Sequence, residues 1–290
     1  MQNLITLHID HPGLYSTLQD TGRAGHQAQG VPVGGALDRD AAWLANRLVG
    51  NEPEEPVLEM TLQGPVIRLA QETQLALTGA DLSPTLNGAP LPMYESVRVQ
   101  AGSELRFGRR RSGCRAYLAV RGSWQAQRWL DSVSPPPYRA EALTPDSLLK
   151  KGSVIKVEPR GFLPRRIYPD YARPDLTAPH YCRLLPGPEY EQFSGEFKEW
   201  FFARQHRVSA DSNRMGYRLQ EAYDGLVWTE ELISSAVLPG TVQVTRSGQP
   251  IVLLSDAQTT GGYPRLGIVP ERERSRLAQV CPGEWVRFGI

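Results

Sequence analysis

Residues 249–264 read QPIVLLSDAQTTGGYP and place an apolar run directly before a dense group of polar residues. The run 251–254 is continuously apolar, as in a strand that is buried on both faces. Similar strand-like runs occur at 95–100, 115–120, 153–157 and 241–245. Since the chain also has 27 glycines and 24 prolines, which end regular elements, these short runs predict a mainly β protein.

Helical patterns are few. Asp38 is placed to cap a helix over residues 38–49, and Gly50 is placed to end it. A second helix is expected over residues 189–202, where four aromatic residues fall on one face, and a third, shorter helix over residues 229–237.

The length of 290 residues suits two domains of ordinary size. Prolines recur between residues 159 and 179, and each blocks helix and removes a backbone donor. We interpret this stretch as a connection between domains at 1–170 and 171–290; a long surface excursion of one domain is the alternative. The sequence similarity between GSELRFG (102–108) and GEWVRFG (283–289) favours two related halves of the chain.

Charge and cysteine usage exclude several classes of protein. Lys and Arg total 32 against 31 for Asp and Glu, so the net charge of +1 disfavours binding to nucleic acid or anionic membranes. The three cysteines are far apart in the sequence and odd in number, so they indicate no disulfide framework and have no metal-ligand spacing. The start, MQNLITLHIDHPG, resembles no secretory signal, and no apolar stretch is long enough to span a membrane, so we expect a cytoplasmic protein.

Three glycine-bracketed polar segments are candidates for a binding site. Residues 12–51 include Asp20 and Arg23; the alternative is a polar loop in which these two residues pair. Residues 209–220, SADSNRMGYRLQ, include Arg214, which could clamp a carboxylate or phosphate; the alternative is an Asx-type turn with an exposed arginine that contributes little to folding. Residues 249–264 could form an anion-binding nest at Gly261 and Gly262, or a hairpin whose polar residues cap the turn.

These segments, with further blocks such as LALTGAD, CRAYLAVRG, LPGPEY and LPGTVQV, resemble the family of the C-type subunit of 5-oxoprolinase, also called KipA-like or allophanate hydrolase subunit 2. The resemblance covers nearly the whole chain. It implies two cyclophilin-like β-barrel domains with a few short helices. The chain departs from the family pattern at residues 121–153, where the usual glycine-rich stretch is absent.

The family resemblance also implies a function. It implies a subunit that, with a KipI-like B-type subunit and a LamB/YcsF-like A-type subunit, opens 5-oxo-L-proline to L-glutamate while ATP is hydrolysed. The chain has no Walker motif, so the ATP site, with Mg²⁺, would be unconventional or shared with the partner. The alternatives are the carboxyltransferase component of a biotin-dependent urea carboxylase-like system, and a regulatory antagonist that binds KipI.

Under the first hypothesis, charge that develops on the lactam oxygen needs cations and amide donors. We expect Asp20, Arg23, Arg214 and Asp256 to serve catalysis, and we expect no resident metal site formed by this chain alone. The expected substrate-binding residues follow from the second and third segments and should share one cleft with the catalytic set: Asn213, Gln249, Gln258, Thr259, Thr260, Gly261 and Tyr263.

Overall fold

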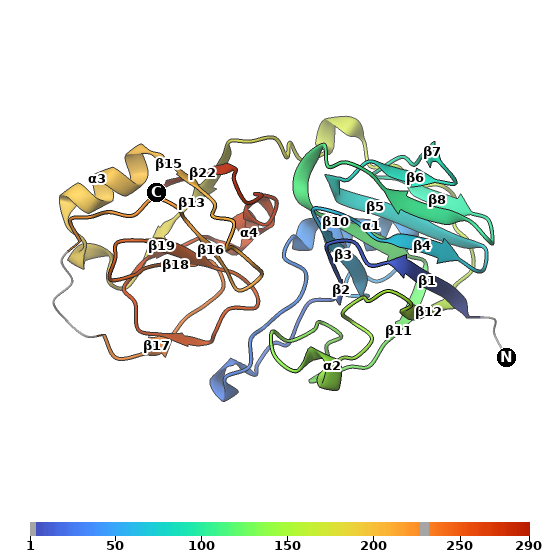
Figure 1. Ribbon diagram of the computed structural model, residues 1–290, viewed down its shortest axis with the longest axis horizontal. Coiled ribbons are helices and arrows are strands. Elements are labelled where there is room, and N and C mark those ends of the chain that lie inside the picture. Colours follow the sequence, from blue (N-terminus) through green and yellow to red (C-terminus); the bar gives the residue numbers. More distant parts are fainter. Residues whose placement is uncertain (1–3, 227–231) are drawn as a thin grey trace. The chain divides into compact units, whose positions relative to one another are not determined.

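The computed structural model describes residues 4–226 and 232–290. It divides into two compact units (Figure 1). Unit 1 consists of residues 1–22 and 34–176, and unit 2 of residues 23–33 and 177–290. Unit 1 thus ends within the proline-spaced stretch. The domain boundary after residue 170, which the sequence indicates, stays a prediction.

Unit 1 is built from two open β-sheets with one main helix. The seven-stranded sheet has the order β11-β12-β1-β4-β9-β6-β7, and the five-stranded sheet the order β2-β3-β10-β5-β8. The elements are β1 (Ile5–His11), β2 (Tyr15–Gln19), α1 (Arg39–Val49), β3 (Val57–Thr61), β4 (Val66–Leu69), β5 (Thr73–Asp81), β6 (Pro84–Leu86), β7 (Ala89–Pro90), β8 (Ser96–Val99), β9 (Glu104–Phe107), β10 (Ser112–Val120), β11 (Gly122–Gln125), α2 (Ala140–Leu143), β12 (Val154–Pro159) and the 3-10 turn η2 (Asp170–Ala172).

The five-stranded sheet is buried on both faces. Leu118 of β10 joins residues of the seven-stranded sheet, such as Leu7 and Ile67, in one core. The alternate residue Tyr117 packs in a second core with Ala45 of α1. This double burial explains why CRAYLAV is apolar with little interruption.

Helix α1 forms as the sequence predicts. The Asp38 carboxylate accepts a hydrogen bond from the Ala41 N–H at 2.9 Å, and Gly50 ends the helix at φ 71°. Its buried stripe includes Ala41, Ala45 and Val49. Capping and amphipathic spacing together therefore fix both the length and the facing of this helix.

Unit 2 contains three smaller sheets with the orders β14-β21-β18-β19-β16, β13-β22-β15 and β17-β20. Its elements are the 3-10 turn η1 (Gln27–Gln29), β13 (His180–Arg183), β14 (Leu185–Pro186), the 3-10 turn η3 (Tyr190–Gln192), α3 (Gly195–Ala203), β15 (Gln205–Arg207), β16 (Gly216–Arg218), β17 (Ser235–Ala236), β18 (Thr241–Val244), β19 (Pro250–Leu253), β20 (Thr260–Gly261), β21 (Arg265–Ile268), α4 (Glu271–Leu277) and β22 (Trp285–Gly289).

Two helix predictions in this unit need correction. The helix expected over 189–202 is split, because Phe193 is extended and the Ser194 hydroxyl accepts a hydrogen bond from Phe197 N–H at 3.1 Å, which starts α3 afresh. The helix expected over 229–237 begins outside the described residues. Its described part is wrong, because Ser235–Ala236 pairs with β20 as strand β17.

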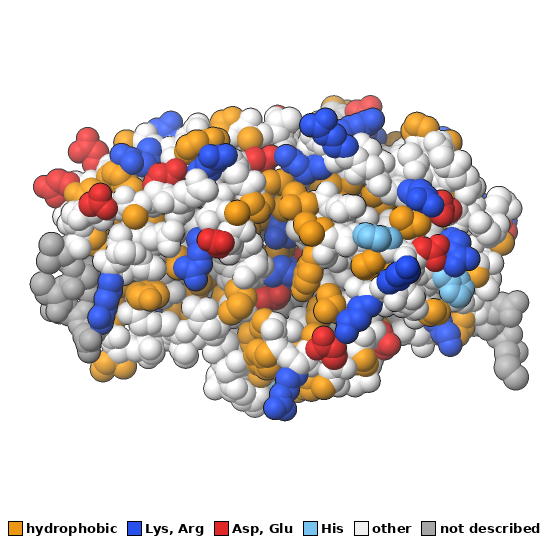
Figure 2. All heavy atoms as spheres, in the orientation of Figure 1, with side chains coloured by type: hydrophobic (Ala, Val, Ile, Leu, Met, Phe, Trp, Pro, Cys, Tyr) orange, Lys and Arg blue, Asp and Glu red, His pale blue; other side chains and the backbone are white. Residues whose placement is uncertain are grey.

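The mainly β fold class is confirmed, and each of the five predicted strands is present. Within the described residues the strands form open sheets and no closed barrel, which corrects the barrel expectation. No helix in the described ranges has the length and apolarity to cross a membrane. On the face drawn in Figure 2, basic and acidic side chains are interspersed.

Candidate functional site

Two of the predicted site segments lie side by side in unit 2. The Asp256 N–H donates to the Arg214 carbonyl at 3.2 Å, and the Leu254 N–H donates to the Met215 carbonyl at 3.0 Å. The turn before β16 is therefore bonded along its backbone to the segment that follows β19. Arg214 and Asp256 are 42 positions apart in the sequence.

Arg214 and Asp256 form a buried bidentate ion pair. Arg214 Nε lies 2.8 Å from one Asp256 carboxylate oxygen, and Nη2 lies 3.1 Å from the other. Arg214 is only 7% exposed and Asp256 only 4%. The alternative of an exposed arginine is therefore wrong. The Nε–Nη2 edge of the guanidinium, which a ligand carboxylate would use, is already occupied by Asp256.

An Asx-type turn presents this arginine. The Asn213 side-chain oxygen accepts a hydrogen bond from Met215 N–H at 2.8 Å, and Asn213 N–H donates to Gly216 O at 3.2 Å. Asn213 itself is exposed. The turn explains why Asp, Ser and Asn cluster here, since short polar side chains satisfy backbone groups where no ladder is available.

Gln249 and Tyr263 line one pocket of about 750 Å³ in unit 2. The pocket lies where the β18–β19 turn meets the end of β16, which contributes Arg218. The Gln249 side-chain nitrogen donates to Leu219 O at 3.0 Å, so its amide plane is fixed. Tyr263 is 44% exposed. The pocket thus combines a cation, an oriented amide and an accessible aromatic side chain.

The remaining residues of the third segment have a structural setting. Thr260 and Gly261 form β20 and pair with β17. A Cβ at position 261 would lie 2.6 Å from the Gln243 amide nitrogen, so the glycine permits a close side-chain approach. Gln258 is exposed and Thr259 partly so. The geometry favours the hairpin alternative over an anion-binding nest at Gly261 and Gly262, because the backbone of Gly261 belongs to a ladder.

Asp20 lies in unit 1 and holds a loop of the divergent region. Its two carboxylate oxygens accept hydrogen bonds from Ser132 Oγ at 2.6 Å, Ser134 Oγ at 2.8 Å, Val133 N–H at 2.8 Å and Gly22 N–H at 2.9 Å. Arg128 adds an ion pair at 3.7 Å. Four short hydrogen bonds leave this 7% exposed carboxylate engaged with its own chain.

Arg23 belongs to unit 2 and is 1% exposed. Its N–H donates to Val33 O at 2.6 Å, which closes the segment 23–33 on itself. Because Asp20 and Arg23 fall in different units, one cleft that holds the whole predicted set stays a prediction. Within unit 2 the structure pairs Arg214 with Asp256 and places Gln249 with Tyr263.

A buried polar network around Glu59 was not anticipated from the sequence. The Glu59 carboxylate accepts hydrogen bonds from Tyr117 Oη and from Leu37 N–H, both at 2.9 Å, and Arg115 Nε lies 3.8 Å away. Burial beside Glu59 raises the pKa of Tyr117 well above its ordinary value. The available signal was a lone acid inside the apolar strand VLEMT, since a buried charge requires partners.

The predicted site residues do not fit a Mg²⁺ site within this chain. In the described ranges, no group of three or more His, Cys, Asp or Glu could hold a metal ion. Asp20 and Asp256 direct their carboxylate oxygens to internal donors instead. Mg²⁺ prefers several open oxygen ligands, so a metal shared with a partner would need ligands from that partner.

Comparison with known proteins defines the class. The carboxyltransferase domain, subdomain A and B, matches residues 29–290, so the chain belongs to this family. More particularly, it is 37% identical over 282 residues to the C-type subunit of 5-oxoprolinase from Escherichia coli (strain K12), and the match covers 97% of this chain and 90% of that protein. The family resemblance inferred from the sequence blocks is thereby confirmed.

Two longer proteins share the same region. The chain is 31% identical to urea amidolyase of Saccharomyces cerevisiae over 97% of its own length but spans only 16% of that protein. The crystal structure of TTHA0988 superposes with a TM-score of 0.88 at 33% identity; it covers 100% of this chain, which spans 56% of the TTHA0988 chain. The fold therefore recurs both alone and as part of larger chains.

Proposed function

We propose that this chain is the C-type subunit of an ATP-dependent 5-oxoprolinase that, with the B-type and A-type subunits, opens 5-oxo-L-proline to L-glutamate. One observation carries the proposal: 37% identity to a C-type 5-oxoprolinase subunit extends over almost the full length of both chains. The match includes the loops between the strands, where binding residues mostly lie.

The pocket at Gln249 and Tyr263 supports a substrate-binding role. 5-Oxoproline carries one carboxylate and one lactam amide. The Arg218 guanidinium makes no hydrogen bond or ion pair with the described residues, so it can bind the carboxylate. The Gln249 side chain donates its N–H to Leu219 O, which leaves its oxygen to accept the lactam N–H.

The catalytic residues proposed from the sequence take more specific roles in this scheme. The Arg214–Asp256 pair positions the turn 213–216 and adds a fixed dipole beside β16 and β19. Arg23 remains a proposed cation for charge that develops on the lactam oxygen. Asn213, Gln258, Thr259, Thr260 and Gly261 remain proposed substrate contacts, and Asp20 would act by holding loop 132–134.

The complex supplies what this chain lacks. We infer that ATP with Mg²⁺ binds at a site shared with the KipI-like B-type subunit, and that the LamB/YcsF-like A-type subunit completes hydrolysis. Phosphorylating a lactam oxygen requires nucleotide and amide to be aligned away from water, which two subunits can achieve by closing on each other. The complex would work in the cytoplasm.

Reconstitution tests the proposal. The chain and the B-type and A-type subunits are purified separately, and ATP-dependent glutamate release from 5-oxoproline is followed for each combination. Turnover is expected only when all three are present. The matched variants Arg218→Gln and Arg111→Gln should differ, with a loss of about 10- to 100-fold in kcat/KM for the first alone. Absence of turnover in the full mixture would overturn the proposal.

A carboxyltransferase role is the second candidate, because the family description and the urea amidolyase match both favour it. It requires a biotin carboxylase and a biotinylated carrier protein from elsewhere. Carboxyl transfer from carboxybiotin to urea by this chain, without glutamate release in the assay above, would support it. Binding to a KipI-like protein with neither activity would instead support the regulatory antagonist.

A further inference from the structure

The three-stranded sheet β13-β22-β15 has one face covered and one face open. On the covered face, the Phe288 ring of β22 stacks on Phe201 of α3 with centroids 5.3 Å apart. Strand alternation assigns the other side chains of this face, all of which are buried: His180, Cys182, His206 and Val286. Helix α3 and its aromatic cluster therefore seal this side of the sheet.

The opposite face of the same sheet is exposed and carries no acidic residue. The strand register places Arg287 between Tyr181 and Gln205, and Trp285 beside Arg207. Tyr181 is 50% exposed and Trp285 is 41% exposed. We refer to this surface as the arginine face; it consists of Tyr181, Arg183, Gln205, Arg207, Trp285 and Arg287.

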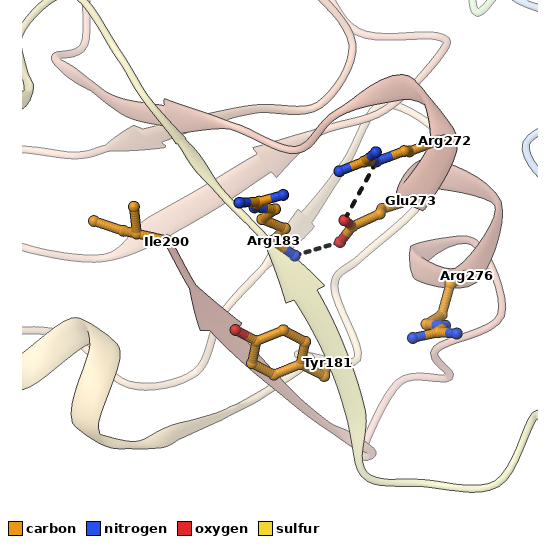
Figure 3. Close-up of a pocket in the computed structure, with 6 residues that line it drawn as sticks. All are labelled: Tyr181, Arg183, Arg272, Glu273, Arg276 and Ile290. Atoms are coloured by element: carbon orange, nitrogen blue, oxygen red, sulfur yellow. Dashed lines mark hydrogen bonds and ion pairs between the residues drawn. The ribbon is translucent and has the colours of Figure 1, made fainter.

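Two acidic residues, Glu221 and Glu273, adjoin the arginine face and offset part of its charge. Their hydrogen bonds come from backbone N–H groups, that of Arg207 at 2.8 Å and that of Arg183 (Figure 3). The guanidinium groups of Arg183 and Arg287 make no ion pair or hydrogen bond within residues 4–226 and 232–290. Two exposed cations are therefore available to a ligand.

Tyr181 lies flat across the end of β22. A Cβ at Gly289 would lie 1.9 Å from the Tyr181 hydroxyl, so only glycine admits this position of the ring. The ring separates two hollows that both contain Tyr181 and Ile290. One, of about 550 Å³, adds Arg272 and Arg276 of α4 (Figure 3). The other, of about 400 Å³, is mainly apolar and adds Phe202.

We propose that the arginine face docks an acidic surface of a partner protein, one that presents an apolar side chain flanked by carboxylates. The chemistry is complementary, because carboxylates would meet Arg183 and Arg287 while the apolar side chain would enter the hollow beside Tyr181. Tyr, Trp and Arg are the residues that most often dominate binding energy at interfaces. The proposal rests on the proposed function only in taking that partner to be the KipI-like B-type subunit.

The surface around Tyr181 extends beyond the six side chains of the arginine face. A specific interface buries roughly 800 Å² on each partner, more than six side chains of three short strands provide. The two hollows at Tyr181 continue the arginine face toward α4 and toward Phe202. Contact over all of this surface would place Tyr181 at its centre, where truncation costs most affinity.

A single-stranded nucleic acid is the competing occupant, since aromatic and basic side chains on a sheet can also stack bases and bind phosphates. The balanced charge of the chain, +1 overall, disfavours it, because oligonucleotides need a basic track that extends well beyond one sheet face. A fluorescent thymidylate oligonucleotide, about 20 nucleotides long, is therefore included as a probe, since it spans more than one typical single-strand site.

The test measures the affinity of the full chain for the purified KipI-like partner. Arg183→Glu with Arg287→Glu should raise Kd by about 10- to 100-fold, because like charges would then oppose each other across the interface. Arg183→Lys with Arg287→Lys should stay within about threefold and keep the salt dependence of binding. Arg109→Glu with Lys151→Glu, which makes the same charge change on exposed turns of unit 1, is the control and should bind as the wild type does.

Each outcome decides the proposal. Equal Kd values for the reversal variant and the control overturn it, as does failure of the wild-type chain to bind the KipI-like partner. If the reversal variant loses binding to the thymidylate oligonucleotide but binds the partner as the wild type does, the proposal is overturned in favour of a nucleic-acid site. If the reversal variant does not fold, Arg183→Gln with Arg287→Gln replaces it. A further outcome separates the two proposals. If the wild-type mixture releases no glutamate but the reversal variant still loses affinity for the partner, the proposed function is rejected and the docking surface is retained.

Discussion

Asp20 and Asp256 are two buried carboxylates with the same predicted role and different surroundings. In unit 1, Asp20 accepts hydrogen bonds from hydroxyl and backbone groups of a loop more than 110 positions away. In unit 2, Asp256 faces one guanidinium, that of Arg214. The first carboxylate organises four uncharged donors, and the second pairs with one charge. A polar residue between glycines can thus stabilise its own fold in two physically distinct ways.

The largest expected effect comes from breaking the ion pair. Asp256→Ala leaves the Arg214 charge buried without its carboxylate and should lower the free energy of unfolding by about 3–5 kcal/mol. The combined change Arg214→Met with Asp256→Leu removes both charges and should lie near the wild-type value. Urea denaturation measures both. A double variant as unstable as Asp256→Ala would mean that the pair does more than neutralise charge.

Asp20→Ala should have the next largest effect. It removes the acceptor from two hydroxyls and two backbone N–H groups, and we expect a loss of about 2–4 kcal/mol. No apolar double replacement can rescue it, because the backbone donors remain. Hydrogen exchange should speed up at residues 132–134. Unchanged exchange there would remove the assigned role of Asp20.

Ser132→Ala tests whether the donors around Asp20 act singly or together. The 2.6 Å bond to Asp20 is lost while the other three hydrogen bonds to the carboxylate remain. The Ser134 N–H also loses its acceptor, Ser132 Oγ at 3.1 Å, so a loss of about 1–2 kcal/mol is expected. Ser123→Ala, at a serine outside this loop, is the control. Comparing Ser132→Ala, Ser134→Ala and their double variant shows whether the two hydroxyl contributions add.

The smallest expected effect concerns pH. Glu189 combines both kinds of contact, because it accepts hydrogen bonds from the Arg265 guanidinium at 2.6 and 2.8 Å and from the Arg265 backbone N–H at 3.0 Å. The Arg265 side chain holds the pKa of Glu189 below its ordinary value. A carboxyl whose pKa is lower in the folded state stabilises the protein above its unfolded pKa, and that stability is lost as pH falls through the folded pKa.

Glu189→Gln should therefore be less stable than the wild type near neutral pH, and the difference should shrink in acid. Thermal unfolding of both proteins from neutral pH down through the Glu189 transition measures this. A difference that stays constant over the whole range would show that the ion pair contributes nothing through its charge.

Local pattern predicted much of the fold and little of the site. Alternation and capping sufficed for β8, β10, β12, β18, β19 and α1, because each depends on residues within a few positions. The break at Ser194 had a local signal, a capping serine, that the aromatic periodicity obscured. In contrast, the Asp20 contacts and the Glu59–Tyr117 bond join distant positions, and the second of these depends on the pairing of β3 with β10.

The segment 23–33 has a consequence for how the protein is made. It groups with unit 2 although it is synthesised before the rest of that unit, between two stretches of unit 1. At about 5–20 residues per second, roughly 140 further residues separate its emergence from that of residue 177, a delay of about 7–30 seconds. Unit 1 can therefore begin to fold on the ribosome before the rest of unit 2, with which segment 23–33 groups, has been synthesised. A cut that isolates residues 177–290 would remove Arg23 from the unit in which it is buried.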